Sequence, residues 1–139
     1  MRSASRLASR AAVLLLAAGV GLASAATVHV RLTGRHEVPP VKTMARGSGV
    51  IEVAADGAVS GKVSTRGIKA TMAHIHEAPA GKDGPVIIPL ERGPNGTWLV
   101  PAGSKLSPEQ YKAFLAGGLY INVHSKAHPG GEIRGQLEP

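Results

Sequence analysis

The chain has 139 residues, of which 43% are hydrophobic and 3% aromatic, with no cysteine and a formal net charge of +7 at pH 7. Without cysteine the protein can form neither disulfides nor a cysteine-linked lipid anchor, so its hydrophobic core must hold it together. Its few aromatic residues offer no base-stacking platform and its basic residues are scattered, so nucleic-acid binding is not expected.

The first 25 residues have the pattern of a signal peptide. Three arginines precede an apolar stretch over 11–23, and small residues at 23–25 resemble a cleavage site. We therefore expect an exported protein, secreted or periplasmic, with a mature domain over 26–139.

Loss of the three arginines leaves that domain 13 basic and 9 acidic side chains, a net charge of +4. The apolar stretch is shorter than the roughly 20 residues of a membrane helix, so no stable membrane insertion is expected after cleavage. A mildly basic surface of this kind could contact anionic lipid or polysaccharide.

Short strands punctuated by glycine and proline are expected throughout the mature domain. An alternating run covers 27–33, and Asp56-Gly57 is typical of a two-residue hairpin turn between strands at 47–55 and 58–65. Further strands are expected at 70–76, 86–90, 97–100, 119–125 and 132–137. Strands this closely spaced predict a single all-β domain, an antiparallel sandwich or barrel.

One short helix is expected near residues 107–116. Ser107 can cap its N-terminus, and Gln110 stands where a capping box needs a side-chain acceptor. Gly117-Gly118 ends the helix. Its apolar stripe, which would plug one end of the sandwich, consists of Tyr111, Phe114 and Leu115.

Two histidines one residue apart, His74 and His76, lie in the strand expected at 70–76. Because strand side chains alternate, the two project from one face with Cα atoms about 6.7 Å apart, close enough for both imidazoles to bind one ion. In the strand expected at 119–125, His124 lies on the face opposite the apolar residues, and a neighbouring strand could bring it in as a third ligand. An antiparallel sheet usually has one solvated face, however, and polar residues there need no function.

Four further residues share this expected polar face and are candidates for supporting roles: Met72, Asn122, Glu132 and Arg134. Three neutral imidazoles suit copper or zinc, and a nearby thioether favours copper, although ordinary packing is the commoner role for Met72. Glu132 and Arg134 are expected to pair with each other or to orient a histidine, as Asn122 could also do.

Motifs spread over the whole expected domain resemble those of one family. Three segments carry the resemblance: ATMAHIHEAPAGKDGPV at 70–86, GLYINVHS at 118–125 and PGGEIRGQL at 129–137. An opening motif, LTGRHEVPPV, stands at 32–41. Together they are similar to the chordin-type (CHRD) domain. The resemblance implies an exported module with an antiparallel immunoglobulin-like β-sandwich or Greek-key barrel, and since most of that family has no assigned activity, it implies no enzyme.

The sequence thus predicts an exported binding protein that holds copper, or less readily zinc, on His74, His76 and His124. One alternative is a structural or protein-interaction module without metal, whose partner would be an extracytoplasmic protein. Another, less favoured, is a copper-dependent redox enzyme resembling copper-zinc superoxide dismutase, which has a comparable His-x-His-Glu strand but also a cysteine pair and a zinc loop that this chain lacks. The histidines expected at the surface are His29, His36 and His128.

Overall fold

The computed structural model describes residues 25–139, so the expected signal peptide lies outside the described residues except for Ala25. The described part is an antiparallel β fold with one α-helix, as the sequence predicts. Its elements in chain order are β1 (Ala26–Thr33), a 3-10 turn (Gly34–His36), β2 (Arg46–Val53), β3 (Val59–Arg66), β4 (Ala70–Glu77), β5 (Val86–Pro89), β6 (Glu91–Arg92), β7 (Thr97–Leu99), α1 (Pro108–Leu115), β8 (Leu119–Ser125) and β9 (Ile133–Leu137). Among these residues, no helix is both long and apolar enough to cross a membrane.

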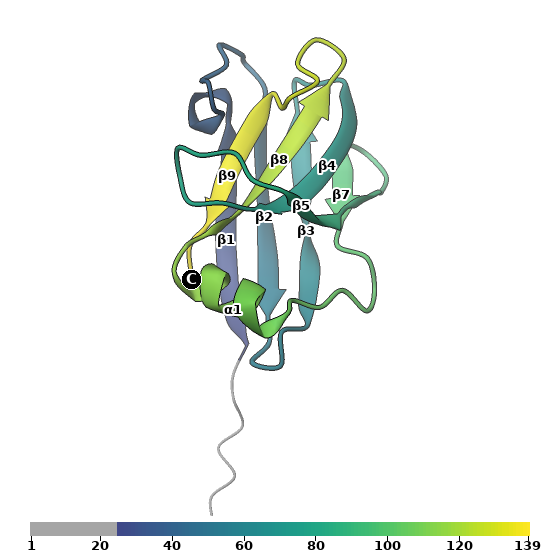
Figure 1. Cartoon of the computed structure of the whole chain (residues 1–139). Helices are drawn as coiled ribbons and strands as arrows, with labels where there is room; N and C mark the ends of the chain where they lie inside the picture. The colour runs from purple at the N-terminus through teal and green to yellow at the C-terminus, as the bar shows by residue number, and fades with distance from the viewer. Residues whose placement is uncertain (1–24) are drawn as a thin grey trace, which may run out of the picture.

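All nine strands belong to one sheet, in the order β5-β4-β8-β9-β1-β2-β3-β7-β6. The sheet folds over on itself, so that β4, β8 and β9 form one layer and β1, β2 and β3 lie behind them (Figure 1). Leu90 connects β5, at one edge of the sheet, to β6, at the other edge. Its amide donates to the Ala73 carbonyl of β4, while the next residue, Glu91, pairs with Leu99 of β7. The strand expected at 86–90 therefore changes partners at its end, and the sheet nearly closes into a barrel.

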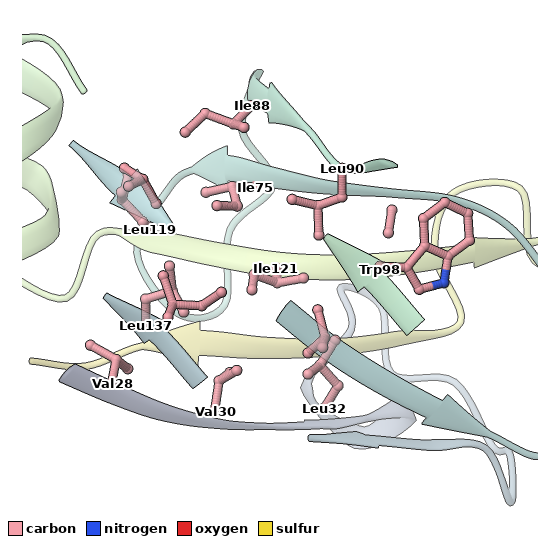
Figure 2. Close-up of a cluster of buried hydrophobic side chains, with 14 of the residues drawn as sticks. Val28, Val30, Leu32, Ile75, Ile88, Leu90, Trp98, Leu119, Ile121 and Leu137 are labelled. Carbon is pink, nitrogen blue, oxygen red and sulfur yellow. The ribbon is translucent and has the colours of Figure 1, made fainter. Parts of the chain in front are cut away.

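The core fills the space between the two layers, as strand alternation requires (Figure 2). Val28, Val30 and Leu32 point inward from β1 and meet Ile121 of β8, all of them at most 3% exposed. Phe114 of α1 is fully buried. Since α1 lies across one end of the barrel (Figure 1), it closes that end as expected.

The predicted capping box of α1 is present. The Gln110 amide donates to Ser107 Oγ at 3.1 Å, and the Ser107 amide donates to Gln110 Oε1 at 2.8 Å. The predicted apolar stripe is only partly correct, since Leu115 is 54% exposed. Adjacent residues lie about 100° apart around a helix, so Leu115 leaves the core while Phe114 faces it.

The hairpin predicted between β2 and β3 is present, but its turn is longer than two residues. Beyond the Val53–Val59 pair, the Ala54 amide donates to the Ala58 carbonyl at 2.9 Å, so three residues, 55–57, form the turn. Gly57 has a φ of +90°, the left-handed conformation that glycine adopts most easily. Asp56 acts instead through its carboxylate, which accepts a hydrogen bond from the Ala58 amide at 2.9 Å.

Candidate metal centre

Strands β4 and β8 are neighbours in the sheet and bring the three histidines together. In their register Met72 lies opposite His124, and His74 lies opposite Asn122. Nδ1 of His74 is 3.0 Å from Nε2 of His124. With one nitrogen taken from each ring, His74, His76 and His124 present three candidate ligand atoms within 4.8 Å of one another.

Backbone carbonyls orient two of the rings. Nδ1 of His76 lies 2.9 Å from the Gly84 carbonyl oxygen, and Nδ1 of His124 lies 2.9 Å from that of Pro129. Since a carbonyl only accepts, both Nδ1 atoms must donate, which leaves a lone pair on each Nε2. Nε2 of His76 is buried and has no hydrogen-bond partner. Metal-binding imidazoles are held in this way, with the second nitrogen donating to a carbonyl or carboxylate.

Burial lowers the pKa of both His74 and His124 below the ordinary 6.5. The neighbouring imidazoles lower both pKa values further, because positive charges on adjacent rings would repel each other. The Pro129 carbonyl acts against this at His124, where its hydrogen bond raises the pKa. Both rings are therefore neutral at pH 7, the form in which imidazole binds a metal.

A loop over residues 78–85 covers the outer side of this layer. Gly84 connects it to the site, since its carbonyl accepts from His76 and its amide donates to the Tyr120 hydroxyl at 3.1 Å. The Tyr120 ring stacks on His76 with an interplanar angle of 3° and centroids 4.8 Å apart. All seven residues of β8 are buried. The expectation of a solvated outer face is therefore wrong for β8, and this second, polar layer is packed like a core.

The four candidate supporting residues occupy different environments. Met72 is 50% exposed, so it is not packing filler, and its register position places it beside His124 at the solvent side of the site. Asn122 is buried, and its amide nitrogen lies 3.5 Å from the Gly130 carbonyl. Arg134 is buried against the Tyr120 ring, with its guanidinium carbon 3.4 Å from the ring centroid.

Glu132 does not pair with Arg134, and that expectation is wrong. Its two carboxylate oxygens accept hydrogen bonds from the hydroxyls of Ser125, at 2.6 Å, and Thr43, at 2.7 Å. Ser125 follows His124 in a strand, so its side chain points to the other face. Gly131, with a φ of +124°, turns the backbone just before β9 begins and so directs Glu132 away from the histidines. Arg134 instead approaches Asp83, at 3.4 Å.

Sequence reasoning missed a buried carboxyl group in the polar layer. Glu37 is 4% exposed, and burial raises its pKa to about 7, although the positive charge of Arg134 and the nearby Asn122 side chain lower it. Its Oε1 has no partner. The only sequence signal was its place in the motif at 32–41, because no strand periodicity marks a residue in a connection.

We expect Glu37→Gln to remove part of the pH dependence of folding. The folded protein keeps the Glu37 proton up to about pH 7, whereas an unfolded chain loses it near the ordinary pKa of 4.5. The parent's free energy of unfolding should therefore fall as the pH rises between these values, by up to about 3 kcal/mol, and the variant should lack that fall. Urea unfolding at a series of pH values measures it. A constant difference between the two proteins from pH 4 to pH 8 would contradict the shifted pKa.

The remaining histidines lie elsewhere. His29 and His36 are exposed, as expected, while His128 is half-buried in the turn after β8. There the His128 amide donates to Ser125 Oγ at 3.1 Å. Within residues 25–139, His74, His76 and His124 form the one group of three or more side chains with metal-ligand spacing.

Comparison with known families adds one finding. The model of the CHRD domain matches residues 28–137, which is most of the chain and includes all three histidines. No curated protein and no solved structure matches significantly.

Proposed function

The chain belongs to the CHRD domain family, and we propose that this member is an exported binding protein that holds one copper ion on His74, His76 and His124. The observation that carries the proposal is Nε2 of His76, which is buried and without a hydrogen-bond partner beside two other imidazoles. A buried acceptor left unpaired costs about 1–3 kcal/mol, a cost that a bound metal would remove. The leader pattern at residues 1–25 supports export.

The spacing of the nitrogens suits a single ion. Bonds of about 2.0–2.1 Å allow two ligand nitrogens to be at most about 4.2 Å apart. His74 Nδ1 and His124 Nε2 already satisfy this limit at 3.0 Å, and the full set needs only a small ring rotation from its 4.8 Å spread. In the present arrangement His74 Nδ1 must donate to His124 Nε2. Metal binding would therefore release that proton or move it to the other nitrogen of His74.

The chemistry around the site favours copper over zinc. Among the described residues, the group with metal-ligand spacing contains no carboxylate and the chain has no thiolate, so three neutral nitrogens are the core donor set. The half-exposed thioether of Met72 beside His124 is a soft donor that Cu(I) accepts and zinc rarely uses. Stacking of Tyr120 on His76 would shield one side of the ion, while Met72 and the half-exposed His74 leave the other side accessible.

Metal titration of the purified mature protein tests this function. The parent should bind one copper ion per chain, more tightly than zinc when each competes with a chromophoric chelator, and His124→Ala should lose this binding because only two nitrogens remain. His29→Ala is the matched control, since His29 is exposed on β1 and should leave the affinity unchanged.

Equal copper binding by the parent and His124→Ala would overturn the metal proposal and favour a protein-interaction module. Tighter binding of zinc than of copper would overturn the choice of metal. Superoxide dismutation that rises with copper content would show instead that the bound ion is catalytic.

A further inference from the structure

The outer face of β1, β2 and β3 carries a set of positive side chains, separated from the histidine strands β4 and β8 by β9. Strand register places these residues in three successive rows across the strands. The rows are Thr33–Arg46–Arg66, Arg31–Ser48–Ser64 and His29–Val50–Lys62. We call this set the basic face.

Glu52 is the carboxylate in the next row of this outer face, but among residues 25–139 no acidic side chain forms an ion pair with the basic face. Within residues 25–139 a single ion pair is present, between Arg134 and Asp83, so the face's arginines and its lysine have no carboxylate oxygen within 4.0 Å. Arg46 and Arg66 lie directly opposite each other on adjacent strands. Like charges in that position destabilise a sheet. A bound anion would relieve this repulsion.

One arginine of the face is already oriented. Nη1 of Arg46 donates to the Thr43 carbonyl at 3.1 Å and to the Ala45 carbonyl at 2.7 Å. These bonds hold the guanidinium beside the strand and leave its other N–H groups free to bind. A side chain held in place loses less conformational entropy when it binds a ligand.

Two hollows share Arg31, one on the face and one beside it. The first has a volume of about 490 Å³ and is lined by Arg31, Arg46 and Arg66 together with the hydroxyls of Ser48 and Ser64. The second, about 660 Å³, is lined by Arg31, His29, Arg35 and His36 on one side and by the 78–85 loop and β9 on the other. It also contains two carboxyl groups, those of Glu37 and Glu138. Burial raises the pKa of Glu37 to about 7, which reduces its negative charge at neutral pH.

We propose that the basic face binds a linear sulfated polysaccharide. Arginine forks match the oxygens of a sulfate ester, and serine hydroxyls can donate to sulfate and sugar oxygens. Two hollows that share Arg31 suit an extended chain better than a single small anion. The face has no phenylalanine, tyrosine or tryptophan to stack on a nucleic-acid base. Its one exposed apolar side chain is Val50, 37% exposed, which is little to insert into a lipid surface.

Binding to dextran sulfate, measured by calorimetry at about 50 mM and about 200 mM salt, tests the proposal. The parent should bind, and its affinity should fall as salt rises, because binding releases counterions. The double variant Arg31→Gln/Arg66→Gln should lose about tenfold or more in affinity. Lys105→Gln/Lys112→Gln removes the same charge from exposed positions outside the face and should lose less than about threefold. His124→Ala should bind like the parent, which separates this site from the metal centre.

Three results would overturn the proposal. These are no binding of dextran sulfate by the parent at the lower salt, an equal loss in the two double variants, and tighter binding of single-stranded DNA or of phosphatidylserine vesicles than of dextran sulfate. Thermal unfolding of each variant checks that a loss of binding is not a loss of fold. The four arginine and lysine side chains of the double variants are exposed, so both should fold like the parent.

Discussion

Arg134→Ala should lower the free energy of unfolding by about 3–5 kcal/mol, since breaking a buried charged network leaves its partners unsatisfied. Arg134 is 1% exposed. Its guanidinium lies on the Tyr120 ring and donates to the Pro79 carbonyl at 3.2 Å and to Asp83 at 3.4 Å. The variant would leave a cavity beside Tyr120 and would remove the cation that lowers the pKa of Glu37. Urea unfolding monitored by circular dichroism measures the loss.

Two control variants separate the causes of that loss. Arg66→Ala removes an exposed arginine of the same sheet and should change stability by less than about 0.5 kcal/mol. Arg134→Met keeps much of the side-chain volume and removes the charge, so it distinguishes packing from ionic contacts. If Arg134→Ala unfolds within about 1 kcal/mol of the parent, the loop over 78–85 does not depend on this arginine.

Gly84→Ala should weaken copper binding about 10–100-fold, because residues that orient metal ligands typically contribute that much. A Cβ at residue 84 would collide with the backbone carbonyl of Glu77, which cannot rotate away as a side chain could. The loop must therefore shift, and both the His76 and Tyr120 hydrogen bonds to Gly84 would be lost. His76 would then be free to rotate and change tautomer. Chelator competition gives the affinity, and urea unfolding gives the accompanying loss of stability.

Gly130→Ala is the matched control for this substitution. A Cβ at residue 130 would have no heavy atom within 4 Å beyond its chain neighbours, and the φ of Gly130 lies outside the left-handed region. The variant should bind copper and unfold like the parent. Parent-like copper affinity in Gly84→Ala would show that the loop does not orient His76, even if the three histidines bind the ion.

Local chemistry was enough to predict much of the fold. Ser107 and Gln110 cap α1 as expected, because a capping box depends only on residues three apart. Strand alternation likewise placed His74 and His76 on one face and His124 on the matching face of its own strand. The Asp56-Gly57 hairpin was located correctly, but its length depends on the register of β2 and β3, which a dipeptide does not determine.

The order of residues along the chain dictates which side chains share a face, which segments are strands and where the helix begins. What covers those faces is decided by the folded arrangement. It placed β4 beside β8, packed the 78–85 loop over the histidines, buried Glu37 within the influence of the Arg134 charge and turned Glu132 toward Ser125. The difference arises because alternation and capping act between neighbours in the chain, whereas burial and pKa depend on residues far apart in it, such as His74 and His124.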